Sequence, residues 1–524
     1  MIQRARMSGS QRWNTLYSSN DRGPSNRNVH GSHARARHLV LSVGLILSLA
    51  SLTSCARTSD ANVQASSGLN APAVATSPSA EEQVLLDSLA TRTFRFFWEQ
   101  GDPKTGMMHD RWPTPSFVSV ASTGFALTAY PIGVEEGLVT REAAAERVVT
   151  TLEFFWTAPQ GPEARGMTGY KGFFYHFLEP GTGHRFEDVE LSTIDSALLL
   201  AGVLFCQSYF DGEAPAEERI RALADSLYLR TEWDWAAVRP PAVSHGWNPE
   251  EGHLPYDWIG YSEAMLLYVL AIGSPSHPVD PAAWSRWTSG YRWGELLGYE
   301  HVGFAPLFGH QYSHVWIDFR GIQDEYMRSK GIDYFENSRR ATLAQRAYAI
   351  ANPHAWKGYG ERLWGLTACD GPVNMQMEVG GTLRQFETYS ARGATFDYVN
   401  DDGTIAPTAM AASLPFAPEV VLPGLVAMHE DHPHAFSTYG FLDALNPTFD
   451  FDVKVQHGRV LPGAGWVDSD YLGIDQGPIL AMIANYRTDL VWRVMRTNPH
   501  VIRGLRAAGF TGGWLDPSRE CESK

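Results

Sequence analysis

The sequence predicts an all-α fold, an (α/α)6 toroid in which six inner helices are surrounded by six outer helices. Short polar or acidic motifs, each opening an apolar helical segment, recur at intervals of about 60 to 80 residues. The six motifs are residues 122–127, 190–198, 261–266, 321–326, 401–406 and 472–477. Such a repeat is typical of folds in which each unit is one supersecondary element packed against the next. We expect all inner helices to begin at one end of the ring, and the active site to lie there.

The segments between and after these motifs distinguish inner from outer helices. Residues 197–205 and 264–271 are apolar on every side, and a helix that is hydrophobic all round is expected to be buried. Residues 141–156, 216–233 and 333–350 are amphipathic with helical periodicity. We therefore expect inner helices from the first set and outer helices from the second.

Two stretches between the predicted helices lack helical periodicity. In the first, the aromatic residues 172–178, the turn residues 179–183 and the returning residues 184–186 predict a β-hairpin. The second, residues 358–400, is rich in glycine, and a loop of this length is usually functional. We expect the hairpin and the long loops to form the rim of the active site.

The repeat accounts for residues 81–512 as one catalytic domain, followed by a polar tail at residues 513–524. Residues 1–38 are polar and rich in arginine without an apolar period, which indicates a disordered extension or a start codon placed too early. Residues 56–80 are rich in Ser, Ala and Pro and predict a flexible tether.

Residues 39–55 predict a lipoprotein signal. Basic residues precede an apolar run of about 14 residues, which is too short to span a bilayer. The run ends in Leu52-Thr53-Ser54-Cys55, which resembles a bacterial lipobox. The alternative is a buried helix with an incidental cysteine. We expect a lipid on Cys55 and a location in the bacterial cell envelope, in the periplasm or anchored to the outer membrane.

Charge and cysteine usage exclude several classes of partner and scaffold. The formal net charge is −16, and it becomes about −22 when residues 1–54, with seven arginines and one aspartate, are removed. Nucleic acid is therefore not expected as a partner. The cysteines other than Cys55 are scattered, at Cys206, Cys369 and Cys521, which argues against a disulfide scaffold. We expect a monomer.

Aromatic and polar side chains in the predicted loops suggest a sugar ligand. Phe, Trp and Tyr make up 12% of the chain, and sugar rings stack on such side chains, although most large aromatic residues pack in the core. Residues 309–320 combine hydrogen-bond donors, acceptors and aromatic rings. The residues expected to bind substrate are Tyr170, Tyr175, His310, Gln311, Tyr312, Asp318, Arg320, Trp364, Trp466 and Tyr471.

Three acids are candidates for glycoside hydrolysis, which requires a proton donor and a second carboxylate across the cleft. Glu190 precedes a predicted helix and has no structural explanation of its own, whereas Asp195 fits a capping box with Ser192. Glu263 and Asp475 each open a predicted inner helix, where a carboxylate would also serve as a cap or interact with the helix dipole. The candidates are therefore Glu190, Glu263 and Asp475.

The environment of Glu263 decides which role it could take. The helix dipole would lower the pKa of a carboxyl group in the first helical turn, whereas a general acid needs a raised pKa. Glu263 could act as the acid only if apolar neighbours such as Trp258, Tyr261 and Met265 desolvate it. Otherwise it would be a base or a ligand for the sugar.

The remaining candidate residues have structural explanations, and the motifs of other enzyme classes are absent from the sequence. Asp318 could simply pair with Arg320, and residues 401–403 fit a turn. His310 and His314 have i, i+4 spacing without the glutamate of a metalloprotease motif, so neither a metal nor a cofactor is expected. The sequence also lacks a phosphate-binding glycine loop, a nucleophile elbow and a dinucleotide fingerprint.

Five longer segments, residues 123–133, 169–177, 190–195, 309–314 and 471–478, resemble the glucoamylase-like domain family. Within it the chain is most similar to glycoside hydrolase family 144, bacterial β-1,2-glucanases of (α/α)6 fold, from about residue 82 to residue 510. The resemblance implies hydrolysis of β-1,2-glucan, inverting and without a metal, to sophorose or short oligosaccharides, and endo action is the mode that we expect. It also makes Glu190 and Glu263 the leading catalytic pair, with Asp475 third.

Three other functions remain open at this point. Related domains occur in cyclic β-1,2-glucan synthases, although a single lipid-anchored domain favours a hydrolase. A surface lipoprotein that binds glycans without cleaving them, and a lyase or an epimerase on the same toroid, are the alternatives. Endo and exo action are not distinguished by the sequence.

Overall fold

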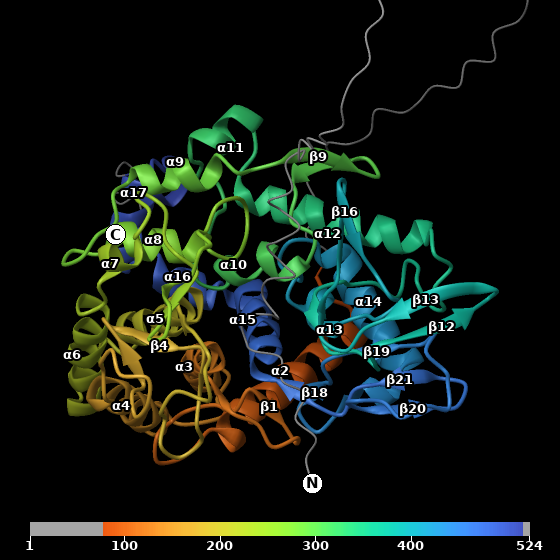
Figure 1. Cartoon of the computed structure of the whole chain (residues 1–524), viewed down its shortest axis with the longest axis horizontal. Helices are drawn as coiled ribbons and strands as arrows, with labels where there is room; N and C mark the ends of the chain where they lie inside the picture. The colour runs from red at the N-terminus through yellow and green to blue at the C-terminus, as the bar shows by residue number, and fades with distance from the viewer. Residues whose placement is uncertain (1–76, 517–524) are drawn as a thin grey trace, which may run out of the picture.

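The computed structural model describes residues 77–516, which form a largely helical molecule with small sheets between the helices (Figure 1). The predicted N-terminal extension, the lipoprotein signal with Cys55 and most of the tether lie outside the described residues, as do residues 517–524 of the tail. None of the described helices is long and apolar enough to cross a membrane.

The helices match the predicted periodic segments closely. The described helices are α2 (Ala80–Gln100), α3 (Val120–Glu135), α4 (Arg141–Thr157), α5 (Thr193–Tyr209), α6 (Pro215–Leu229), α7 (Trp233–Ala236), α8 (Met265–Gly273), α9 (Ala282–Thr288), α10 (Tyr312–Trp316), α11 (Glu325–Lys330), α12 (Tyr334–Ala351), α13 (Pro407–Ala411), α14 (Pro418–Asp431), α15 (Gly473–Thr488), α16 (Leu490–Met495) and α17 (Pro499–Ala507). The segments predicted as amphipathic outer helices correspond to α4, α6 and α12, with boundaries within one to four residues.

The two segments predicted as apolar on every side are buried along their whole length, in α5 and α8. Helix α3 packs against α5 and α15, α5 also contacts α8, and α15 contacts α10 and α13. In Figure 1, α15 lies near the middle of the molecule, with α3, α5 and α10 around it. These helices therefore form the interior of the domain, whereas α4 and α6 bury only one face against it.

Two glycines allow α3 and α5 to approach closely. A Cβ atom on Gly124 would lie 2.4 Å from the carbonyl oxygen of Leu198, and a Cβ atom on Gly202 would lie 2.2 Å from the carbonyl oxygen of Gly124. Any side chain at either position would push the helices apart. The glycines thus determine the distance between these two buried helices.

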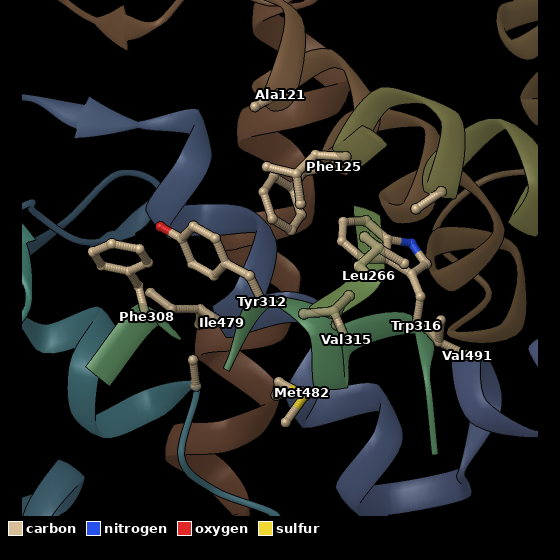
Figure 2. Packing of buried hydrophobic residues seen from close by; sticks show 14 of the residues in the cluster. Ala121, Phe125, Leu266, Phe308, Tyr312, Val315, Trp316, Ile479, Met482 and Val491 are labelled. Carbon is tan, nitrogen blue, oxygen red and sulfur yellow. The ribbon is translucent and has the colours of Figure 1, made fainter. Parts of the chain in front are cut away.

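Aromatic rings fill the space between the buried helices. Phe125 of α3 stacks on Trp316 of α10, with ring centroids 5.1 Å apart, and meets the edge of Tyr312. Figure 2 shows these rings beside Ile479 and Met482 of α15, with the hydroxyl group of Tyr312 turned away from Val315 and Met482. The interior is therefore apolar at the level of Trp316 and becomes polar at the Tyr312 hydroxyl.

The strands are short. They are β1 (Arg111–Trp112), β2 (Val118–Ser119), β3 (Gly169–Tyr170), β4 (Phe173–Tyr175), β5 (Phe177–Leu178), β6 (Leu191–Ser192), β7 (Gly246–Asn248), β8 (Gly252–His253), β9 (Trp293–Leu296), β10 (Tyr299–Val302), β11 (Ala368–Cys369), β12 (Met375–Val379), β13 (Thr382–Phe386), β14 (Ser390–Ala391), β15 (Gly393–Thr395), β16 (Tyr398–Asn400), β17 (Phe436–Ser437), β18 (Gly440–Phe441), β19 (Leu445–Asn446), β20 (Arg459–Leu461), β21 (Gly465–Val467) and β22 (Tyr471–Leu472). The largest sheet has the antiparallel order β3-β4-β6-β7-β8.

Three of the buried helices follow directly from such strands. Strand β2 leads into α3, β6 leads into α5, and β22 leads into α15. The strands are paired with neighbouring segments, as in the register of Arg111 with Leu472 and of Phe174 with Ser192. Each of these three helices is therefore preceded by a short strand that is paired with another part of the chain.

The predicted hairpin differs in detail. The reversal between β3 and β4 occurs at Lys171 and Gly172, which both have positive φ, at 58° and 82°, as a tight hairpin turn requires. The predicted turn at residues 179–183 is also present, closed by a bridge between Leu178 and Arg185. The chain therefore reverses twice where the sequence predicted one reversal.

Residues 358–400 were predicted as a long loop, and they contain six short strands, β11 to β16. Strands β12 and β13 pair over five residues each and project from one edge of the molecule (Figure 1). The prediction that this stretch is not helical is correct, but it is a set of hairpins and not an irregular loop.

Candidate active site

A group of buried aspartates surrounds the N-terminal end of α15. Asp475 lies in the first turn of α15, and Asp443, Asp468 and Asp470 follow strands β18 and β21. Asp370 follows β11, and Asp110 immediately precedes β1. All six side chains are buried. The short strands therefore bring together carboxylates from four separate parts of the sequence.

Hydrogen bonds of the backbone hold these aspartates in place. The N–H of Asp370 donates to Oδ2 of Asp443 at 2.7 Å. The N–H of Asp443 donates to the carbonyl oxygen of Asp470 at 2.9 Å, and the N–H of Gly473 donates to the carbonyl oxygen of Asp110 at 3.0 Å. Fixed backbone contacts of this kind preorganise the group before any ligand is bound.

The aspartates outnumber the positive charges near them. The guanidinium group of Arg111 contacts Asp370, lies 3.4 Å from Asp110 and lies 3.6 Å from Asp470. Carboxylate oxygens of Asp370, Asp443 and Asp468 lie within 4.8 Å of one another. Like charges at such distances cannot all be ionised in a buried site.

The pKa values of the cluster reflect this crowding. Burial and the neighbouring Asp370 raise the pKa of Asp443 to about 6. Burial and the charge of Asp443 raise the pKa values of Asp468 and Asp475 well above their ordinary range. Near neutral pH the cluster therefore contains both protonated and ionised carboxyl groups, which is the condition required for proton transfer.

Asp370, Asp443 and Asp468 are also the described residues whose geometry would suit a hard cation, because calcium and magnesium prefer carboxylate oxygens. The histidines considered in the sequence are not among them. Nε2 of His310 lies 3.1 Å from the carbonyl oxygen of Phe304, and Nε2 of His314 lies 3.0 Å from the hydroxyl of Ser338. Both rings are buried, and burial lowers the pKa of His314 to about 3.

Glu190 belongs to a second polar group beside the aspartates. Its Oε1 lies 2.9 Å from Nδ1 of His176, and Nε2 of His176 lies 3.6 Å from Oδ1 of Asp195. Burial by itself would lower the pKa of His176, but the charges of Asp195, Glu190 and Asp110 raise it to about 9. The ring is therefore an imidazolium at neutral pH. Asp110 lies beside both His176 and Arg111, and so it connects the two groups.

The predicted helix cap at Ser192 is present. The hydroxyl of Ser192 accepts a hydrogen bond from the N–H of Asp195 at 3.2 Å and also donates to the Asp195 carboxylate. At two other motifs the structure does not have the helix caps that the sequence predicted. Helix α3 begins at Val120 with Ser119 as its cap, ahead of the motif at residues 122–127. Asp475 makes no capping hydrogen bond, so capping does not explain it.

Glu263 lies just before α8, not in its first turn, because α8 begins at Met265. The hydroxyl of the preceding residue, Ser262, accepts a hydrogen bond from the N–H of Ala264. The carbonyl oxygen of Glu263 accepts a hydrogen bond from Ser313 of α10 at 2.8 Å. The Glu263 side chain is only 2% exposed, and the predicted apolar neighbours Trp258, Tyr261 and Met265 are all buried.

The hydroxyl group of Tyr312 lies near Glu263 and two of the aspartates. Burial first, and then the charges of Asp475, Glu263 and Asp443 among others, raise the pKa of the Tyr312 hydroxyl well above its ordinary value. These three carboxylates therefore approach one hydroxyl group from α15, from the segment before α8 and from the segment after β18. Tyr312 is the predicted substrate-binding residue that the structure brings to this centre.

Several other predicted substrate-binding residues are packed inside the molecule. Tyr175, His310, Gln311, Trp364 and Trp466 are buried. The side-chain amide of Gln311 donates to the carbonyl oxygen of Ala409 at 2.8 Å, and the indole N–H of Trp466 donates to His457 at the same distance. A fully buried ring has no face on which a sugar can stack, so the aromatic residues among them pack inside the domain.

Tyr170 and Tyr471 lie near the strands that frame the site. Tyr170 is half-buried in an aromatic group with Trp235 and Trp247. Tyr471 is buried in β22, where it packs against Tyr439. Tyr170 therefore keeps some exposed surface, whereas Tyr471 serves the packing of β22.

Asp318 and Arg320 are not part of this centre. Both follow the C-terminal end of α10, where Arg320 pairs with Asp318 at 2.8 Å and with Asp489 at 3.0 Å. Asp489 directly follows α15, so this ion-pair group lies one helix length, about 20 Å, from Asp475. Asp318 therefore forms the ion pair with Arg320 that the sequence analysis gave as the alternative to substrate binding.

The motif at residues 401–403 is a turn, as predicted, but it is buried and paired. Asp402 forms an ion pair with the buried Arg392, and Asp401 accepts hydrogen bonds from Tyr348, Trp356 and Tyr359. Cys206 and Cys369 are free and buried, in line with the absence of a disulfide scaffold among the described residues.

Asp110, Asp370, Asp443, Asp468 and Asp470 are the site residues that sequence reasoning missed. One local pattern could have indicated some of them. In residues 440–446 and 465–475, aspartates stand next to aromatic or aliphatic residues that favour β-strands. Such short segments do not show helical or strand periodicity, so periodicity alone does not find them.

The chain is similar to known proteins in sequence and fold. Residues 255–499 match the family model Glycoamylase, described as "Putative glucoamylase". A crystal structure from Bacteroides uniformis, described in the same words, has 30% sequence identity and a TM-score of 0.70, over 84% of this chain and 100% of that chain. An endo-β-1,2-glucanase from Chitinophaga pinensis, solved with sophorotriose and glucose, has 26% identity and a TM-score of 0.70, over 83% of this chain and 99% of that chain.

A curated relative is the exo β-1,2-glucooligosaccharide sophorohydrolase (non-reducing end) of Parabacteroides distasonis. It is 28% identical over 466 residues, which is 82% of this chain. The chain spans 58% of the length of that relative. The fold, the mostly helical architecture and the matched segments thus lead to one conclusion: the chain belongs to the glucoamylase-like family.

Proposed function

We propose that this protein is a glycoside hydrolase that cleaves β-1,2-glucan. The observation that carries the proposal is that three buried carboxyl groups, those of Glu263, Asp443 and Asp475, all lie near the Tyr312 hydroxyl. Glycoside hydrolysis requires two carboxyl groups with different proton affinities on the two sides of the scissile bond. The relatives that act on β-1,2-glucan supply the substrate class.

In this proposal Glu263 is the general acid, because its side chain is buried and its predicted neighbours Trp258 and Tyr261 are buried with it. Desolvation favours the protonated form that an acid catalyst needs. Asp443 is the general base that activates water, since a pKa of about 6 leaves it ionised at neutral pH. Asp475, whose pKa is raised further by the charge of Asp443, supports Asp443 as a protonated neighbour.

We further propose endo action with inversion of the anomeric configuration, without a metal, to sophorose or short oligosaccharides. The domain would be an (α/α)6 toroid with α3, α5, α8, α10, α13 and α15 as its inner helices. Five of the six recurring motifs lie at or just before the beginnings of α3, α5, α8, α13 and α15, and most of these helices pack against one another, which supports this arrangement. The sixth motif, residues 321–326, was expected to open an inner helix, but it leads into the short helix α11, in which only Met327 is buried. We also propose a monomer that is lipid-anchored at Cys55 in the cell envelope. Labelling with a radioactive fatty acid, compared between the wild type and Cys55→Ala, tests the anchor.

The function is tested by incubating the purified protein with linear β-1,2-glucan and, in parallel, with β-1,3-glucan and starch. We expect new reducing ends from β-1,2-glucan alone, with short products from the beginning of the reaction. Proton NMR in the first minutes should show the α-anomer, as inversion requires. Binding of the glucan without any cleavage would instead support a glycan-binding protein, and activity on starch would reject the substrate class.

A further inference from the structure

His176 is enclosed by carboxylates from three parts of the chain. Glu190 lies 2.9 Å from Nδ1 of the ring, and Asp195 of α5 lies 3.6 Å from Nε2. Asp110, which precedes β1, is the third charged group close to it. The ring also stacks on Phe177 of β5, with centroids 3.9 Å apart. Both ring nitrogens therefore face acceptors, and the ring plane is fixed by stacking.

Glu190 is the most exposed of the three side chains of Glu190, His176 and Asp195, although all three are buried. The side chain of Glu190 is 9% exposed, compared with 6% for His176 and 4% for Asp195. Oε2 of Glu190 has no hydrogen-bond partner among the described residues, whereas Oε1 is bound to His176. A buried carboxylate oxygen without a partner is costly, and a hydroxyl group of a ligand would satisfy it after a small movement of the side chain.

We propose that His176 is a positioning residue, whose ring holds the side chain of Glu190 so that its second carboxyl oxygen accepts hydrogen bonds from hydroxyl groups of the glucan. This inference rests on the proposed function. It assigns Glu190 to substrate binding and leaves proton donation to Glu263, whereas the sequence had placed Glu190 in the catalytic pair. A carboxylate that accepts from a charged donor has no proton to give to a leaving group.

The positive charge of His176 also offsets negative charge in the neighbouring aspartate group. His176 and Arg111 both lie beside Asp110, and together they offset part of the charge of the buried carboxylates. Raised pKa values of His176 and Arg111 agree with this arrangement. Loss of the imidazolium would therefore both release Glu190 and increase the repulsion between the acids.

The first test compares leaving groups. Glu263→Gln and Glu190→Gln are assayed with β-1,2-glucan and with an aryl β-1,2-glucooligosaccharide, whose leaving group needs no protonation. We expect the aryl substrate to restore much of the turnover of Glu263→Gln. For Glu190→Gln we expect KM to rise about tenfold with both substrates and kcat to change by less. Restoration of Glu190→Gln by the aryl substrate, with an unchanged KM, would overturn the inference.

The second test follows His176 itself and does not depend on activity. The ring proton signals of His176, identified in NMR spectra by comparison with His176→Asn, should titrate near pH 9. Titration near pH 6.5, the ordinary value for histidine, would reject the imidazolium. His176→Asn can still donate one hydrogen bond to Glu190 but carries no charge, so it should share the raised KM of Glu190→Gln. His277→Asn is the matched control and should leave KM unchanged, because His277 is an exposed histidine whose ring lies 3.6 Å from a carboxylate oxygen of Asp234.

The two proposals fail in different ways. Lack of cleavage of β-1,2-glucan by the wild type would reject the proposed function. Cleavage by the wild type together with a His176 titration near pH 6.5, or with a normal KM in both Glu190→Gln and His176→Asn, would reject only the role of His176.

Discussion

The backbone N–H of Asp370 donates a hydrogen bond to the carboxylate of Asp443 at 2.7 Å, across 73 residues of sequence. This bond joins the segment after β11 to the segment after β18, and it holds the Asp443 carboxylate next to a second aspartate. The raised pKa of Asp443 follows from burial and from this neighbour. The account of the active site therefore depends on a contact between two stretches that the sequence alone does not connect.

Asp443→Asn should stabilise the folded protein at neutral pH. Because the pKa of Asp443 is raised to about 6 in the folded state, folding binds its proton more tightly, and stability falls as pH rises from about 4 to about 6. Above that range the buried charge costs stability, and the neutral amide avoids this cost. We expect the free energy of unfolding at pH 7 to rise by about 1 to 3 kcal/mol, measured by urea denaturation. If Asp443→Asn were less stable than the wild type at pH 7, the predicted charge of Asp443 would be wrong. The same would follow if the variant gained as much stability at pH 4 as at pH 7.

His176 should make the stability depend on pH on the alkaline side. Its pKa is raised to about 9 in the folded state, so its contribution to stability is fully present below about pH 6.5 and is lost as pH rises through 9. Urea denaturation of the wild type at pH 6, 7.5 and 9.5 should show this loss. His176→Asn should lose less stability over the same interval, and an identical loss in both proteins would contradict the assignment.

Gly202→Ala should disturb the packing of α3 against α5. The added Cβ atom would lie 2.2 Å from the carbonyl oxygen of Gly124, which cannot move without moving α3. We expect the free energy of unfolding to fall by at least about 3 kcal/mol. Gly360→Ala is the matched control, because no atom lies within 4 Å of its added Cβ atom. Equal stabilities for the two variants would show that the helices are not in close contact.

Removal of divalent cations tests the metal-independent mechanism. Asp370, Asp443 and Asp468 have a geometry that would suit a cation, but in the proposed reaction Asp443 activates water as a general base without a metal. Dialysis against EDTA should therefore leave the turnover of β-1,2-glucan unchanged, and added calcium or magnesium should not raise it. A loss of activity that calcium or magnesium restores would assign the aspartates to a metal.

The helices could be predicted from the sequence because their signals are local. The apolar segments at residues 197–205 and 264–271 and the amphipathic α4, α6 and α12 follow from helical periodicity. The candidate site could be predicted only in part. Glu263 and Asp475 come to the same centre, but the aspartates around them come from strands of two or three residues, which have no periodicity of their own.

Burial explains most of the differences at predicted binding residues. Trp364 and Trp466 are conspicuous in the sequence as loop aromatics, yet both are completely buried. Asp318 and Arg320 lie only a few residues after Tyr312, but the short helix α10 carries them away from the site toward Asp489. A sequence gives the spacing of these residues along the chain and does not show which end of a helix faces the ligand.

The most direct test of the central claim is the initial rate of reducing-end formation from linear β-1,2-glucan by the wild type, Glu263→Gln and Asp443→Asn. The account predicts cleavage by the wild type and a loss of at least about a hundredfold in both variants, with circular dichroism showing that both remain folded. Absence of cleavage by the wild type, or near-normal rates in both folded variants, would contradict it.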